Sequence, residues 1–361
     1  MSLLAASFLP LALLFLLLPL WPLLSRWRAG VAVAGERIWP IGAAWDAPAR
    51  ASLQRVQESF SDLLQHAERD GLIRGAREDG ALFMILGPHD YLSEHLQIST
   101  RRLRTQLLAV GHLDIPGELI CDRLVYAQAR LNIAHNVVLR TALAGRDAVI
   151  GPRARVRQWI HAGNRLDVAE GAILAGCASA GQEIVLARRA RFERLLSARI
   201  RFGHSFGQRR PAAPLRCLEM QLPAHARQMS DGRWLVDGDL SIPPARQLKA
   251  RLIVNGSLLV GTGSQLRGEL HVMGELVVHH DAYIHGAIQC DAEMRVGECC
   301  LLAGPIRCAG SLSLGSQTIV GTPNRPSTII ARQLQIHEGC IVHGAIHAIQ
   351  RGEVCAESAR T

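Results

Sequence analysis

The stretch LQIHEGCIVHGAIHA, residues 334–348, decides the fold of this chain. Its apolar side chains come in pairs two positions apart, and successive pairs begin six positions apart. Alternate residues of a strand point to the same side, so both members of a pair can face one core. A period of six fits neither an amphipathic helix nor one long strand. The stretch therefore predicts short strands separated by regular corners.

The same six-residue rule runs through two long blocks of the chain. Between residues 148 and 192, eight successive pairs are apolar at both positions, and five more pairs precede them from residue 119. The last of those five is Leu143/Gly145, so the rule predicts that one residue is lost just before Ala148. Between residues 252 and 320, all twelve pairs are apolar at the second position and ten at the first. The insertion GTPNRPST then breaks the phase.

A β-solenoid explains this period. Four extended residues and a two-residue corner make one face, and three faces close one coil of about 18 residues. A single coil buries little, but stacked coils share a continuous core. Glycines such as Gly256 and Gly274 suit the corners, and the low aromatic content of 4% fits a narrow bore. An ordinary β-sandwich is the alternative, but it does not require a fixed six-residue period. The predicted fold is an all-β solenoid.

The N-terminal segment predicts a membrane anchor. Residues 3–24 carry no charge, and such a run can cross a bilayer as a helix. No Lys or Arg precedes the run, whereas Arg26 and Arg28 follow it at once. The positive-inside rule then predicts a single-pass membrane protein with its soluble part in the cytoplasm. A signal peptide cleaved after Ala34 is the alternative, but it would need its basic residues before the apolar run.

Composition and pattern divide the chain into six parts. Residues 1–35 are the predicted transmembrane anchor and link, and residues 36–105 a small juxtamembrane α/β element. Within that element one amphipathic helix is expected, with Asp46 as N-cap, Gly71 as C-cap, and an apolar face made by Leu53, Val56, Phe60, Leu63, Leu64 and Ala67. Two solenoid blocks, 106–202 and 233–352, flank a Pro- and Arg-rich linker or cap at 203–232, and residues 353–361 form a tail.

The second block resembles the bactofilins, which are polymer-forming bacterial cytoskeletal proteins. The matching segments are LIVNGSLLVGTGSQLRGELHVMGELVVHHDAYIHGAI and the opening stretch, and the resemblance covers roughly residues 235–352. It implies a right-handed β-helix that self-associates and has neither enzymatic activity nor a cofactor. Ordinary bactofilins are short and have one solenoid, whereas this chain has two blocks. Hexapeptide acyltransferases are left-handed solenoids with a different repeat, which only VIGPRA (149–154) follows clearly.

Two groups of residues are the candidate sites. The ends of a solenoid are open strand edges that can recruit another chain. The predicted assembly end coil therefore comprises the core residues Leu334, Ile336, Cys340, Val342, Ile346 and Ala348. The alternative is that the predicted helix and the linker at 203–232 cap the ends. An arginine run with the single acid Glu193 is expected either to contact anionic lipid or to form a solvated face; its members are Arg188, Arg189, Arg191, Arg194, Arg199, Arg201, Arg209 and Arg210.

The histidines do not suggest a metal or catalytic site. Those of the second block are His271, His279, His280, His285, His337, His343 and His347. Positions stacked on each other lie about 18 residues apart, and at that spacing no histidine ladder and no carboxylate–histidine pair is evident. Surface histidines are the expectation, with no metal or cofactor. Nucleic acid is not an expected partner either, because stacking aromatics are missing.

Together these patterns predict a membrane-anchored, non-enzymatic scaffold or polymer-forming protein of the bacterial cytoskeleton and cell envelope. Its expected partners are further copies of itself, inner-membrane lipid, and envelope or polysaccharide machinery. The alternative function is a membrane-linked hexapeptide-type acyltransferase that depends on one or two histidines.

Overall fold

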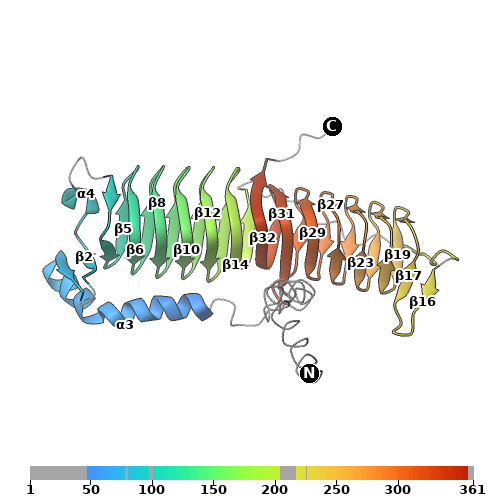
Figure 1. Ribbon diagram of the computed structural model, residues 1–361, viewed down its shortest axis with the longest axis horizontal. Coiled ribbons are helices and arrows are strands. Elements are labelled where there is room, and N and C mark those ends of the chain that lie inside the picture. The colour runs from blue at the N-terminus through green and yellow to red at the C-terminus, as the bar shows by residue number, and fades with distance from the viewer. Residues whose placement is uncertain (1–46, 78–79, 97–100, 204–216, 225, 357–361) are drawn as a thin grey trace, which may run out of the picture. The chain divides into compact units, whose positions relative to one another are not determined.

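The structure is a computed structural model that describes residues 47–77, 80–96, 101–203, 217–224 and 226–356. All of them belong to one unit, Ala43–Thr361. The unit is an all-β solenoid of about 13 coils with two helices among its described residues (Figure 1). This confirms the predicted fold class, while the handedness of the coils remains a prediction.

The first solenoid block, called block 1 below, begins with a helix and a short hairpin. Its elements are α3 (Ala47–Asp70), β1 (Ile73–Ala76), β2 (Leu82–Leu86), α4 (Leu92–His95), β3 (Arg102–Leu103), β4 (Gln106–Ala109), β5 (His112–Ile115), β6 (Ile120–Ala127), β7 (Arg130–Ile133), β8 (Val138–Ala144), β9 (Asp147–Ile150), β10 (Arg155–Ala162), β11 (Arg165–Val168), β12 (Ile173–Ala180), β13 (Glu183–Leu186) and β14 (Arg191–Phe202).

The second solenoid block, block 2, is built from shorter strands until its last coils. Its elements are β15 (Leu218–Glu219), β16 (Arg227–Gln228), β17 (Trp234–Val236), β18 (Leu240–Ile242), β19 (Arg246–Lys249), β20 (Leu252–Val254), β21 (Leu258–Val260), β22 (Gln265–Arg267), β23 (Leu270–Val272), β24 (Leu276–Val278), β25 (Tyr283–Ile284), β26 (Ile288–Cys290), β27 (Met294–Val296), β28 (Leu301–Leu302), β29 (Ile306–Leu314), β30 (Ile319–Val320), β31 (Ser327–His337) and β32 (Ile341–Cys355).

Within each block the coils stack through parallel strands in the predicted register. Leu252 pairs with Leu270, Leu270 with Ile288, and Ile288 with Ile306, each step being 18 residues. All twelve predicted pairs between residues 252 and 320 are buried, and so are all eight between 148 and 192. The two polar exceptions in the bore satisfy their hydroxyls internally, because Ser264 Oγ donates to Pro243 O (2.9 Å) and Thr318 Oγ1 to Gly297 O (2.9 Å).

One predicted pair was wrong by one residue. Ala142 and Ala144, not Leu143 and Gly145, face the bore, and Leu143 points outward. The residue is therefore lost one corner of the coil earlier than predicted, at the bulge where Arg140 of β8 stands opposite two residues of β6. Leu143 is nevertheless only 1% exposed, because helix α3 packs over this face.

Helix α3 has the predicted apolar face and lies along block 1. Phe60, Leu64 and Ala67 pack against the outward side chains of Leu108 and Tyr126, and Gln57 Nε2 donates to Tyr126 Oη at 3.2 Å. The helix ends as expected at Gly71, whose φ of +83° suits a C-cap and whose N–H donates to Ala67 O. The expected N-cap, Asp46, lies outside the described residues.

Both outer ends of the solenoid carry added elements. At the outer end of block 1, the β1–β2 hairpin pairs with β4 and α4 packs on β5. At the outer end of block 2, β15 pairs with β19, and β16 pairs with β17 in antiparallel fashion. Among the described coil strands at these ends, β3 and β18 have neither a further strand nor a helix on their outer edge, whereas β5 has no further strand there but is contacted by α4. β3 and β18 belong to the same face of the coil, so each outer end is capped on two faces of three.

No helix among the described residues is long and apolar enough to cross a membrane. The apolar run at residues 3–24, on which the predicted anchor and localisation rest, lies outside the described residues.

Candidate functional site at the junction of the two blocks

The two blocks join through the strands that end them. β14, the last strand of block 1, pairs in antiparallel fashion with β32, the last strand of block 2 (Figure 1). The pairing covers all three faces of the coil: Arg191 stands opposite Glu353, Leu195 opposite Ile346, and Ile200 opposite Val342. Block 2 therefore winds back toward block 1, and one strand ladder continues through both blocks.

Shape complementarity holds the bore together at this junction. Phe192 of β14 faces Gly352 of β32, and a side-chain carbon on Gly352 would approach the Phe192 ring to 2.3 Å. The Phe192 ring lies 6.0 Å from that of Phe202, and both side chains are at most 2% exposed. An aromatic pair thus fills the bore at the point where the strand direction reverses, in a fold that uses few aromatics elsewhere.

Ion pairs from the arginine run connect the blocks. Arg188 Nε lies 2.7 Å from Glu338 Oε2, whose side chain is only 7% exposed. Arg191 Nε lies 3.6 Å from Glu353 Oε1. A carboxylate as buried as that of Glu338 needs its cation, so this pair fixes the docking of β14 more strongly than a surface pair would.

A second buried acid collects three arginines beside the junction. The carboxylate of Glu183, whose side chain is 8% exposed, lies 2.7 Å from Arg199, 3.3 Å from Arg165 and 3.4 Å from Arg201. These residues sit on β11, β13 and the end of β14, so the cluster ties three successive strands in register. Arg165 also pairs with Asp167, so two acids face three guanidinium groups and this corner keeps a net positive charge.

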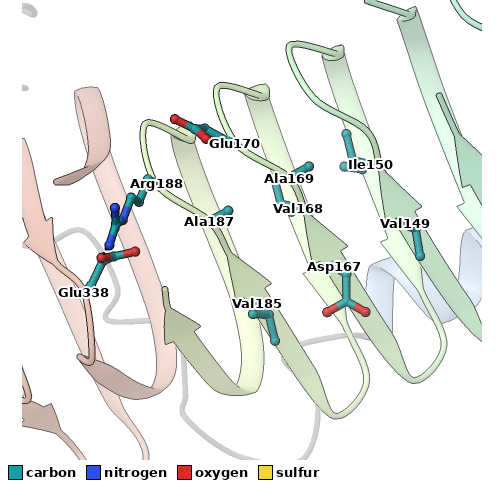
Figure 2. Close-up of a pocket in the computed structure, with 10 residues that line it drawn as sticks. All are labelled: Val149, Ile150, Asp167, Val168, Ala169, Glu170, Val185, Ala187, Arg188 and Glu338. Carbon is teal, nitrogen blue, oxygen red and sulfur yellow. Dashed lines mark hydrogen bonds and ion pairs between the residues drawn. The ribbon is translucent and has the colours of Figure 1, made fainter. Parts of the chain in front are cut away.

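A groove of about 510 Å³ runs along block 1 next to the junction. Figure 2 shows Val149, Asp167 and Val185 on successive strands, with Arg188 and Glu338 at the end nearest block 2. Each acid in its lining has an arginine partner: Asp167 pairs with Arg165, Glu170 with Arg189, and Glu338 with Arg188. The groove can receive a ligand, but its acids are held as ion pairs and do not form a general acid–base pair.

The six residues of the predicted assembly end coil lie at this junction and not at a free end of the solenoid. Its six side chains are at most 1% exposed, as expected of a core coil. However, β32 is covered by β14, so the coil offers no open edge to another chain. The physical reason is that an unpaired edge of one block meets the matching edge of the other within the same chain.

Most described members of the arginine run lie at or beside the same junction. Arg188 and Arg191 pair across it, Arg199 and Arg201 pair with Glu183, and Arg189 pairs with Glu170. Arg194 is exposed. Arg209 and Arg210 lie outside the described residues. Five of the eight members therefore form ion pairs within the chain, and their contact with an anionic surface stays a prediction.

Two histidines differ from the expectation of simple surface residues. His271 Nε2 lies 2.8 Å from Asp291 Oδ2, a carboxylate–histidine pair that the 18-residue spacing does not reveal because the partner is 20 residues away. His343 Nδ1 lies 3.2 Å from Ala198 O across the junction. Burial lowers the pKa of His343 and the charge of Arg199 adds to this, whereas the contact with Ala198 O opposes it.

The described residues contain no cluster of three or more His, Cys, Asp or Glu side chains that could hold a metal. All nine cysteines are free thiols, and five of them line the bore. Burial raises the pKa of Cys300 and of Cys340 to about 12, which keeps these thiols protonated and unreactive.

Comparison with family models, with curated proteins and with solved structures gave no match to this chain.

Proposed function

We propose that the chain is a membrane-anchored, non-enzymatic scaffold of the bacterial cell envelope. The observation that carries this is the antiparallel β14–β32 pairing, which merges two solenoids into one continuous ladder. Such a ladder gives long, regular faces for binding. The resemblance of block 2 to bactofilins supports the same function, and envelope or polysaccharide machinery is the proposed cargo.

Self-association, in this proposal, uses the outer ends. The edge of β18 is the accessible one on block 2: Leu240 N–H donates to Ser257 O and Ile242 O accepts from Gly261 N–H, so both face β21. The backbone groups of Ser241, between them, point to the unpaired side. That side can accept a strand from a second copy.

Sedimentation velocity and negative-stain microscopy on the full chain in neutral detergent test this. Concentration-dependent assemblies are expected for the wild-type protein. Ser241→Pro removes the outward N–H without touching the β18–β21 bonds and should reduce assembly, whereas Ser241→Ala should not. A monomer at every concentration would refute self-association and leave a capped adaptor that works through other partners.

A membrane-linked acyltransferase is the second candidate, and one observation favours it. The pairing of His271 with Asp291 orients an imidazole as a general base requires. Acyl transfer from an acyl-thioester donor that is lost in His271→Ala but retained in His285→Ala would establish it. Absence of activity in the wild-type protein would leave the scaffold as the better account.

A further inference from the structure

An exposed arginine face covers the first coils of block 1. The strand segments 101–104, 120–123, 138–141 and 155–158 hold seven arginines and one acid, Asp122. All seven side chains are exposed. We call this set the arginine face; its members are Arg101, Arg102, Arg104, Arg123, Arg140, Arg155 and Arg157. It is separate from the arginine run at the junction.

Three of these arginines lie on consecutive coils. At the bulges, two residues of β6 and two of β10 stand opposite Arg140 of β8, and Arg123 and Arg157 are each one of these two. Neighbouring strands lie about 4.8 Å apart, so three like charges follow each other at close spacing. Like charges this close repel each other, which an anionic ligand would relieve.

Among the described residues, the strand segments of the arginine face supply one carboxylate, Asp122, for its seven charges. Arg102 Nε donates to Asp122 Oδ2 at 2.5 Å, and this hydrogen bond, followed by the charges of Arg102, Arg157 and Arg104, lowers the pKa of Asp122. One carboxylate therefore serves several guanidinium groups. Arg140 Nε donates at 3.0 Å to Gln158 Oε1, a neutral acceptor that positions the side chain without cancelling its charge.

The same face of block 2 does not share this positive charge. The ladder that begins at Arg102 continues through Arg191 and Glu353 to Ser241. On the block 2 part four acids, Asp239, Glu275, Glu293 and Glu353, stand against three arginines, Arg295, Arg332 and Arg351. The positive charge is thus concentrated on block 1 and is not a general property of the solenoid.

We propose that the arginine face binds the headgroups of anionic phospholipids. Guanidinium groups match phosphate geometry, and basic clusters next to a membrane segment are held by anionic lipid. Block 1 is the block that follows the charge-free run at residues 3–24, through α3. Nucleic acid is less suited, because the aromatic residues on β6 and β10, Tyr126 and Trp159, are buried and half-buried and offer little ring surface for stacking on bases. The inference rests on the proposed membrane-linked scaffold.

The test measures binding of the full chain, held in phosphatidylcholine nanodiscs, to immobilised vesicles that contain phosphatidylglycerol. Binding should fall steeply between about 0.1 M and 0.5 M salt because such contacts are screened. The variant R123Q/R140Q/R157Q should bind on the order of 100-fold more weakly at low salt. R123K/R140K/R157K keeps the charge and should retain most of the binding. R295Q/R325Q/R332Q removes the same charge from block 2 and should bind like the wild-type protein.

Each outcome separates the inference from the proposed function. Equal binding of wild type and R123Q/R140Q/R157Q, or equal binding to vesicles of pure phosphatidylcholine, would overturn the lipid site. So would preferential binding of single-stranded DNA in competition, which would make nucleic acid the partner. If the full chain did not enter nanodiscs, the predicted membrane anchor would be wrong. The lipid site would still be tested, because vesicle binding would then be measured on the full chain without nanodiscs. A melting temperature shared by all variants shows that folding is unchanged.

Discussion

Blocks 1 and 2 obey the same six-residue rule and yet differ in what covers their coils. In block 1 several outward side chains, such as Leu108, Tyr126 and Leu143, are apolar and lie under α3. No described helix packs on block 2, whose outward positions are mostly polar or charged. The inward-facing pairs therefore determine the coil structure, while the outward-facing residues determine which helix packs on the coils and which partners can bind them.

The inner and outer ends of the blocks differ in how their strand edges are covered. At the junction all three faces are paired, and the bore is filled by Phe192 and Phe202 against a glycine. At the outer ends, added strands and a helix cover two faces and leave β3 and β18 open. Strand edges invite pairing unless they are used or blocked, so the chain uses one pair of edges internally and blocks most of the others.

The largest expected effect comes from a charge in the junction bore. Val342→Asp or Ile346→Asp would bury an unpaired carboxylate and should lower the free energy of unfolding by about 4 kcal/mol or more. Chemical denaturation followed by circular dichroism measures it. Ile349→Asp is the matched control in the same strand: Ile349 is 60% exposed, so its change should stay within about 0.5 kcal/mol. Similar losses at both sites would mean that β32 is not buried at a junction.

Gly352→Ala should cause the next largest loss of stability. The new methyl group would meet the Phe192 ring, and overpacking of this kind costs about 1–3 kcal/mol. Phe192→Leu in the same chain should recover part of the loss, because it makes room for the methyl group. The unfolding midpoints of the two single variants and of the double variant, compared with the wild-type protein, give a double-mutant cycle. Strict additivity would show that the two residues do not touch and would contradict the β14–β32 register.

The sequence predicted the coils far better than the junction. Nearly all side chains at inner positions are apolar, Ser264 and Thr318 being exceptions, so period alone locates nearly every core pair. It missed Ala142/Ala144 because Leu143 is apolar for another reason, namely contact with α3. The junction leaves no periodic signal, since β14 and β32 are some 150 residues apart and paired in the reverse direction. The sequence predicts the two sides of the junction, an end coil and an arginine run, only as separate sites.

A smaller effect is expected where one buried acid serves three arginines. Glu183→Gln keeps the shape but removes the charge that Arg165, Arg199 and Arg201 share, and should destabilise the chain by about 1–2 kcal/mol. Arg199→Gln, whose side chain is half exposed, should cost less than about 1 kcal/mol. Thermal unfolding of both variants measures the asymmetry. If Arg199→Gln proved the more damaging change, the cluster would not be organised around the acid.

The smallest effect is a pH dependence at the junction. The pKa of His343 in the folded chain lies below its usual value of 6.5, chiefly because of burial. Between that lowered pKa and 6.5 the unfolded chain binds more protons, so stability rises with pH in this window. The contribution of His343 is therefore complete above pH 6.5 and is lost as the pH falls toward the folded-state pKa. His343→Gln should flatten this part of the stability–pH profile, measured by denaturant midpoints. An unchanged slope in His343→Gln would mean that this imidazole is solvated and that the β14–β32 contact does not enclose it.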